Sequence, residues 1–261
     1  MAVTVERSDG VATVLVDNPP VNALDDPTLI GLRQAAENLA ADPDVRAVVL
    51  TGSGGRVFLA GADLRSLAPA LGPDADGGEM EHHVFLTGPA FAAWSELPQP
   101  AIAAVGGDAL GGGLEFALCC DLIVADPGVR IGLPEVNLGL MPGGGGTQRL
   151  ARRIGLGRAL ELVLFGRVLD AGQAHELGIV SRVSDEGQTL EEALQLAERL
   201  AALPAVAVQS AKRAIRAGSD QGMAEGLARE RGLFLEVAAS ADAREGATAF
   251  LEKRKPSFRH R

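Results

Sequence analysis

The sequence predicts an α/β fold in which a mainly parallel sheet is covered on its faces by helices and is followed by a helical C-terminal part. Two observations predict it. Up to about residue 155, short apolar runs bounded by turn residues alternate with helical patterns, as in a sheet covered by helices. Beyond Gly155 the pattern is helical except at residues 179–183. We therefore expect a core over residues 1–190 and a helical C-terminal region over residues 191–261.

The expected elements follow in order along the chain. Residues 3–6 and 11–16 flank a Ser-Asp-Gly turn and predict a hairpin. A helix opens at Pro27 and ends before Pro43, because leucines and alanines recur between them at helical spacing. Further strands are expected at residues 46–51, 57–59, 101–105, 122–125, 129–131 and 179–183, a helix at residues 112–119, and a helical stripe at Leu190, Ala193, Leu194, Ala197 and Leu200.

Residues 68–80 interrupt this order. They read APALGPDADGGEM, which is rich in Pro, Gly and acidic side chains and has no periodicity. We expect a surface loop there, and loops of this length in compact domains are typically covers near a site.

Composition restricts the possible partners and the location. The 261 residues, 47% of them hydrophobic, suffice for one large core. A net charge of -10 would repel phosphate backbones, so we expect no nucleic acid partner. Charged residues among the first 20 positions interrupt any apolar run suited to a signal peptide or membrane span, so we expect a cytoplasmic protein without membrane insertion.

Several common site motifs are absent from the sequence. The adjacent Cys119 and Cys120 suit neither a disulfide framework nor a zinc site, and the four histidines form no His-x-x-x-His pair, so we expect no metal. No window completes Gly-x-Gly-x-x-Gly, Gly-Lys does not occur, and Gly-x-Ser-x-Gly is missing. Dinucleotide, P-loop and serine hydrolase chemistry therefore lack their usual markers.

Two segments are hard to explain by packing alone. In the first, Gly111, Gly112 and Gly113 directly precede an apolar helix that carries Glu115. A helix that starts at such a turn offers free N–H groups to a developing oxyanion. In the second, Glu135 follows a proline and precedes an apolar run and a second glycine loop. An isolated acidic side chain in such surroundings either pairs with another polar group or takes part in the chemistry of a site.

These segments closely resemble the enoyl-CoA hydratase/isomerase, or crotonase, superfamily. The resemblance rests on residues 58–64 (FLAGADL), 109–115 (ALGGGLE) and 133–150, with the two glutamates twenty positions apart, and it covers nearly the whole chain. It implies a spiral of ββα units followed by a helical C-terminal trimerisation region. It also implies an acyl-CoA substrate, no cofactor because coenzyme A is part of that substrate, and a homotrimer or a hexamer built as a dimer of trimers.

The resemblance also implies roles for individual residues. Glu115 and Glu135 would be the catalytic acids, and the N–H groups of Ala62 and Gly112 would form the oxyanion hole for the thioester carbonyl. The residues implied to bind substrate are Ala60, Ala62, Asp63, Leu64, Arg65, Gly112, Gly143, which would help to seat the water, and Lys253 and Lys255, which would lie near the phosphates of CoA, in some relatives from a neighbouring subunit.

The expected reaction is hydration of a 2-enoyl thioester. One carboxylate must take a proton from water while a second group delivers one to C2, and two acids held in different protonation states do both. We expect Glu115 to be the base and Glu135 the donor, although coupled carboxylates share their titration and the division stays open. Other reactions on the same scaffold, such as enoyl-CoA isomerisation or a carnitinyl-CoA-type dehydration, stay open too, as does a non-catalytic acyl-CoA binder.

Two departures from the family pattern leave these roles untouched. Gln99-Pro100 stands where many relatives have Lys-Pro, and the next turn reads Gly106-Gly107-Asp108. Neither position is catalytic. The segment at residues 68–80, which shapes the acyl pocket in relatives, matches nothing specific, so the acyl chain length is not predicted.

Overall fold

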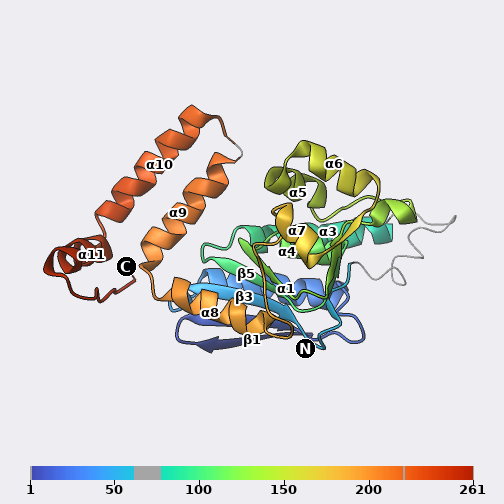
Figure 1. The fold of residues 1–261 in the computed structure, drawn as a ribbon, viewed down its shortest axis with the longest axis horizontal. Helices are drawn as coiled ribbons and strands as arrows, with labels where there is room; N and C mark the ends of the chain where they lie inside the picture. Colours follow the sequence, from blue (N-terminus) through green and yellow to red (C-terminus); the bar gives the residue numbers. More distant parts are fainter. Residues whose placement is uncertain (1, 62–77, 220, 261) are drawn as a thin grey trace.

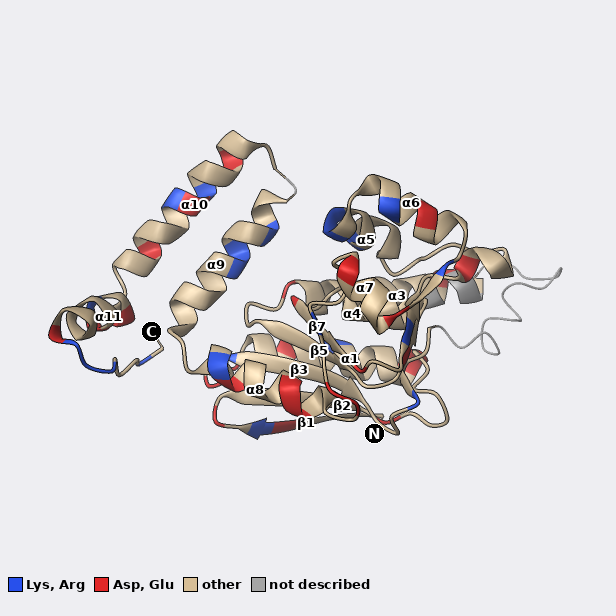
Figure 2. Cartoon of the chain, in the orientation of Figure 1, with Lys and Arg blue, Asp and Glu red and all other residues tan. Residues whose placement is uncertain are grey.

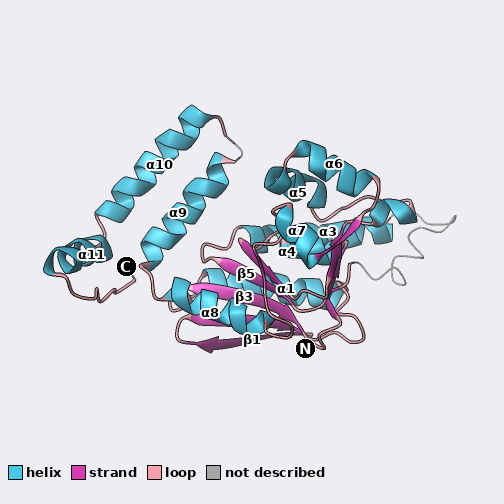
Figure 3. Ribbon diagram, viewed as in Figure 1, coloured by secondary structure: helices cyan, strands magenta, loops and turns pink. Residues whose placement is uncertain are grey.

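Two sheets form the centre of the molecule in the computed structural model, which describes residues 2–61, 78–219 and 221–260 (Figures 1 and 3). The larger sheet has the strand order β1-β2-β3-β5-β7-β10 and the smaller one β4-β6-β8-β9. Their strands are β1 (Val3–Ser8), β2 (Val11–Val16), β3 (Ala47–Gly52), β5 (Ala101–Val105), β7 (Leu122–Ala125) and β10 (Arg182–Val183) in the first, and β4 (Val57–Leu59), β6 (Asp108–Leu110), β8 (Arg130–Gly132) and β9 (Val168–Asp170) in the second.

The helices cover these sheets and then extend beyond them (Figure 3). In chain order they are α1 (Asp26–Ala40), α3 (Gly78–Ser95), α4 (Gly112–Ala117), the 3₁₀ helix η2 (Glu135–Leu138), α5 (Gly146–Ile154), α6 (Leu156–Leu164), α7 (Ala171–Glu176), α8 (Thr189–Ala201), α9 (Ala205–Gly218), α10 (Met223–Ala238) and α11 (Ala241–Glu252).

Strand pairing confirms the mainly parallel sheet. Only β1 with β2 and β8 with β9 pair antiparallel; every other pairing in the described residues is parallel. The chain repeatedly places one strand in the large sheet and the next in the small one, as β3 then β4, β5 then β6, and β7 then β8. In chain order α3, α4 and η2 are the helices that follow these three steps, and α4 packs against β4 and β6 of the smaller sheet.

The core lies between the large sheet and helices α1, α3 and α4. Trp94, Phe58 and Phe116 are its largest fully buried side chains. Trp94 also donates its indole N–H to the carbonyl oxygen of Leu32 at 2.9 Å, which satisfies the only polar atom of a ring that is otherwise surrounded by apolar groups. This packing fixes α3 against α1 on the side where the cavity described below opens.

A second, smaller cluster covers the opposite face of the large sheet. There α8 packs Ala193, Ala197 and Ala201 against apolar residues of β3, β5 and β7. Small side chains let a helix approach a sheet closely. Because α8 packs on the sheet in this way, the helices that project from the core are α9, α10 and α11 (Figure 1). The domain boundary expected at residue 190 stays a prediction.

Most of the predicted elements are present, four of them with the expected bounds: β2, β4, β5 and β7. Two strands were missed, β6 and β9. Each has three residues and too little alternation to be recognised. The strand expected at residues 179–183 is reduced to Arg182–Val183, because Ile179 and Val180 donate their N–H groups to the carbonyl of Ala174 and so close the end of α7.

The loop expected at residues 68–80 lies outside the described residues up to position 77. Its last three residues are helical and open α3, so the loop prediction was wrong there. The error arose because α3 has no apolar face at helical spacing in its sequence and contains Pro89. No helix of the described segments is long and apolar enough to cross a membrane.

Candidate active site

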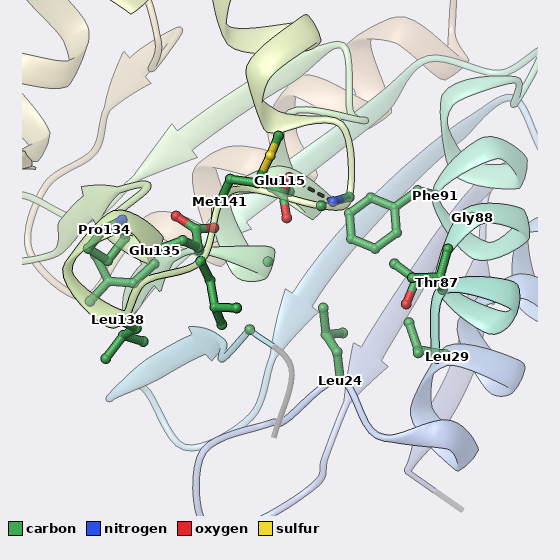
Figure 4. Close-up of a pocket in the computed structure, with 18 residues that line it drawn as sticks. Leu24, Leu29, Thr87, Gly88, Phe91, Glu115, Pro134, Glu135, Leu138 and Met141 are labelled. Carbon is green, nitrogen blue, oxygen red and sulfur yellow. Dashed lines mark hydrogen bonds between the residues drawn. The ribbon is translucent and has the colours of Figure 1, made fainter. Parts of the chain in front are cut away.

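A cavity of about 380 Å³ opens where α3, α4 and the η2 segment meet (Figure 4). Its apolar wall includes Leu24, Phe91 and Met141. The only carboxylates among its described lining residues belong to Glu115 and Glu135. Figure 4 shows both carboxylates facing this cavity from different segments of the chain. The two acids expected from the sequence are therefore brought together at one site.

Close contacts require glycine at two of the three positions where α4 begins. Gly111 has φ +55°, and a Cβ there would lie 3.2 Å from Oε1 of Glu135. At Gly113 a Cβ would lie 1.8 Å from the carbonyl oxygen of Leu59 in β4, which no side chain can do. The glycines thus press α4 against the smaller sheet and bring its first turn beside Glu135.

Glu115 is almost completely buried, with 4% of its surface exposed. Its Oε1 accepts N–H groups from Gly144 at 2.8 Å and from Gly146 at 2.7 Å. Burial raises the pKa of Glu115, while these backbone donors and the guanidinium of Arg149 act in the opposite direction. The carboxylate is therefore desolvated but well supplied with partners for its charged form.

Glu135 has different surroundings. It begins η2, and its Oε2 is buried with no hydrogen-bond partner in the described part of the chain. Burial raises the pKa of Glu135 to about 7, and the negative charge of Glu115 adds to the rise. At neutral pH this side chain can hold or release a proton, whereas the N–H groups around Glu115 favour its ionised form.

The expected oxyanion hole is only partly described. Gly112 lines the cavity, and as the first residue of α4 it has an N–H that the helix cannot pair. Gly61 also lines the cavity, and a Cβ on it would lie 3.1 Å from the nitrogen of Gly112. Ala62 follows Gly61 directly but, like Asp63, Leu64 and Arg65, lies outside the described residues.

The other expected binding residues divide into two groups. Gly143 lines the cavity, as expected. Ala60 does not line it and instead donates its N–H to carbonyl oxygens of the loop before α1. Lys253 and Lys255 are exposed at the end of α11, well apart from α3 and α4 (Figure 2), so within one chain they do not approach the cavity.

Several residues of the site were missed from the sequence. Phe91 packs over the second glycine loop, where a Cβ on Gly144 would lie 2.7 Å from its ring, and its ring centroid lies 4.6 Å from that of Phe116. Met141 and Leu138 form an exposed apolar rim. An apolar residue in a helix looks the same in sequence whether it faces a core or a cavity, so no pattern distinguished them. No three His, Cys, Asp or Glu side chains gather as a metal site in the described ranges.

Comparison with known proteins assigns the class. The sequence pattern of the family described as enoyl-CoA hydratase/isomerase matches residues 6–261, so the chain belongs to this family, the crotonase superfamily. A probable enoyl-CoA hydratase of Mycobacterium tuberculosis is 40% identical over 263 residues, covering 99% of this chain and 98% of the relative. The 2,3-dehydroadipyl-CoA hydratase of Escherichia coli is 41% identical over 261 residues, covering 98% of each.

Solved structures agree with this assignment. An enoyl-CoA hydratase from Bacillus anthracis aligns with a TM-score of 0.94 at 35% identity and covers 100% of both chains. DspI of Pseudomonas aeruginosa aligns with a TM-score of 0.93 at 38% identity, covering 99% of this chain and 97% of that one. The fold is therefore the α/β crotonase fold with two mixed sheets and a helical C-terminal region, and the family implies an acyl-CoA substrate.

Proposed function

We propose that the protein is an enoyl-CoA hydratase that adds water in the syn sense to a 2-enoyl-CoA and forms a 3-hydroxyacyl-CoA. The observation that carries this proposal is the pair of carboxylates, Glu115 and Glu135, which face one cavity in contrasting surroundings. Several relatives are named as hydratases of CoA thioesters, which supports the same reaction.

The geometry suits a division of labour between the two acids. Glu115, held by two N–H donors, is the base that takes a proton from water. Glu135, with a pKa near neutrality, delivers a proton to C2. As charge accumulates on the thioester oxygen, the N–H groups of Gly112 and Ala62 stabilise it by about 3 kcal/mol each. Gly143, beside Glu115, seats the attacking water.

The remaining binding roles belong to the same proposal. Asp63, Leu64 and Arg65 would line the edge of the site that receives coenzyme A. Their support is positional, because they follow or flank β4, whose end lies beside the first turn of α4.

Two acids favour hydration over the alternatives. Isomerisation moves one proton between two carbons of the substrate, and one acid suffices for it, whereas hydration needs a base for water and a donor for carbon. A binder without catalysis gains nothing from two buried carboxylates, which are costly to desolvate.

A direct assay tests the proposal. Crotonyl-CoA is mixed with the purified protein, and the loss of enoyl absorbance is followed together with formation of the 3-hydroxy product. We expect saturable turnover that depends on both glutamates. A preparation that binds the thioester yet hydrates no straight-chain 2-enoyl-CoA would overturn the proposal, and double-bond migration in a 3-enoyl-CoA would favour the isomerase instead.

We further propose that the chain forms a homotrimer, or a hexamer of two trimers. Its projecting helices expose large apolar side chains, including Ile215 on α9, Phe234 and Leu235 on α10, and Phe250 and Leu251 on α11. Exposed apolar patches on such an arm are typical of subunit interfaces. In that assembly Lys253 and Lys255 would serve the CoA phosphates of a neighbouring subunit, and their position at the end of α11, apart from α3 and α4 of their own chain, supports this role.

Sedimentation equilibrium tests the assembly. We expect the mass of three or six chains and a shift to smaller species when Phe234 and Leu235 are both changed to Ser; a monomeric wild-type protein would contradict the proposal. The cytoplasmic location also stays a proposal, and the relative from Dictyostelium discoideum is named as mitochondrial.

A further inference from the structure

One cation lies close to the acidic pair and has no part in the mechanism described above. Arg149, in the second turn of α5, folds its guanidinium back over the start of its own helix. Nη1 donates to the carbonyl oxygen of Gly144 at 2.6 Å, and Nη2 donates to Oγ of Ser95, the last residue of α3, at 2.9 Å. The side chain therefore joins the second glycine loop to α3.

The second glycine loop has room for this guanidinium at Gly145. Gly145 has φ +100°, and a Cβ there would lie 2.1 Å from Nη1 of Arg149. The absence of a side chain at this position leaves the space that the guanidinium fills. Both neighbours of Gly145, namely Gly144 and Gly146, donate their N–H groups to Glu115. Arg149 therefore binds a carbonyl oxygen of the same loop whose N–H groups bind the carboxylate of Glu115.

A cation at this place is unfavourable unless an anion faces it. The N-terminus of a helix carries a partial positive charge, and α5 has no acidic residue in its first turn. Glu115, supplied by α4, accepts the N–H groups at the start of α5 and so provides the missing negative charge. The guanidinium and the helix start both favour the ionised form of Glu115, against the effect of burial.

We propose that Arg149 is a positioning residue of the reaction, which fixes the Gly143–Gly146 loop against Glu115 and keeps that carboxylate ionised. This inference rests on the proposed hydratase function. Arg149 does not line the cavity in the described structure, so it acts through Glu115 and the loop and does not touch the substrate. A fork with two donors is needed, because the carbonyl of Gly144 and the hydroxyl of Ser95 are held at once.

Two substitutions separate the charge from the geometry. Arg149→Gln removes the charge and keeps an N–H₂ donor on a shorter side chain. Arg149→Lys keeps the charge but loses the fork. The matched control is Arg152→Gln, one turn further along α5, where the guanidinium donates to the carbonyl and side-chain oxygens of Gln148. The pH dependence of kcat for crotonyl-CoA hydration is measured for each variant and for the wild type.

The expected outcomes differ between the variants. A base must be ionised to act, and loss of the positive charge raises the pKa of Glu115, so in Arg149→Gln the acid limb of the profile moves to higher pH by about 1 unit. In Arg149→Lys the limb stays within about 0.3 unit while kcat falls by about tenfold, because the loop is held less firmly. Arg152→Gln changes neither quantity.

A second measurement does not depend on turnover. The side-chain carboxyl of Glu115 is titrated by ¹³C NMR in the wild-type chain and in Arg149→Gln, with its signal assigned by its loss in Glu115→Gln. An upward shift in the titration of Glu115 supports the inference about charge even if no hydration is found, in which case the proposed function alone fails. An unchanged titration, or a limb that moves equally in the Lys and Gln variants, overturns the inference about charge. If Arg149→Gln does not fold, an unreduced kcat in Arg149→Lys overturns the positioning role.

Discussion

Replacement of Glu135 by Gln should abolish turnover and at the same time stabilise the fold. Gln has the shape of Glu but cannot deliver a proton to C2, so we expect kcat to fall by more than about a hundredfold. That loss corresponds to about 3 kcal/mol or more in the barrier. Binding of the CoA thioester should be retained, because in the proposed mechanism Glu135 acts on the proton and does not hold coenzyme A.

The stability effect follows from the raised pKa. For Glu135 the pKa rises from 4.5 to about 7, so the folded chain holds a proton that the unfolded chain has released between these values, and wild-type stability falls as pH rises through this window. The full shift corresponds to about 3 kcal/mol. We reduce it to about 1–2 kcal/mol because the side chain is half-buried and screened by solvent. Gln removes this loss, so the variant should be more stable than the wild type above pH 7 and equal to it below pH 4.5.

Two assays check this prediction together. Hydration kinetics give kcat, and thermal unfolding at pH 8 should show a rise in Tm of roughly 2–8 °C for a chain of this size. Glu198→Gln, an exposed substitution on α8, is the matched control and should change neither quantity. Unchanged turnover would remove Glu135 from the mechanism, and a lower Tm at high pH would show that its carboxylate is stabilised in the fold by contacts that the structure does not contain.

Two further substitutions test contacts that hold the fold together. Gly113→Ala should lower the free energy of unfolding by about 3 kcal/mol or more in chemical denaturation, because the new Cβ would meet the carbonyl of Leu59. The control is Gly157→Ala in α6, which has nothing within 4 Å and should be neutral or slightly stabilising. Equal effects of the two substitutions would refute the contact at Gly113. Lys212→Met removes the largely buried ammonium group that lies 2.6 Å from a carboxylate oxygen of Asp121. The free energy of unfolding should fall by about 2 kcal/mol or more, because the carboxylate of Asp121 loses its partner. An unchanged free energy of unfolding would show that the ion pair is solvated.

The fold was predictable where local pattern and burial agree. The strands β4, β5 and β7 have apolar runs bounded by turn residues, and their predicted bounds are those observed. Short edge strands such as β9 depend on a partner far along the chain, since β9 pairs with β8 across more than thirty residues. Such a segment has too few residues to show a period, and tertiary pairing decides its conformation.

The two acidic residues of the candidate site could be picked out from the sequence, but the groups that surround them could not. Glu115 and Glu135 are detectable because each is an isolated charge beside glycines in apolar sequence. The N–H groups that hold Glu115 come from Gly144 and Gly146, and only the folded chain brings these loops together. The ring of Phe91 over the same loop is likewise set by the packing of α3, which had no usable periodicity.

The glycine contacts divide the cavity into a part that resists sequence change and a part that permits it. At Gly111, Gly113, Gly144 and Gly146, an added methyl group would lie against backbone, an aromatic ring or the carboxylate of Glu115 or Glu135, whereas Gly143 has nothing within 4 Å. Val84, Leu138 and Met141, at the outer rim, are exposed and have room to vary. Engineering of a new acyl preference should therefore randomise the rim and leave the glycine-rich floor intact, because diversity at the floor would mostly yield unfolded chains.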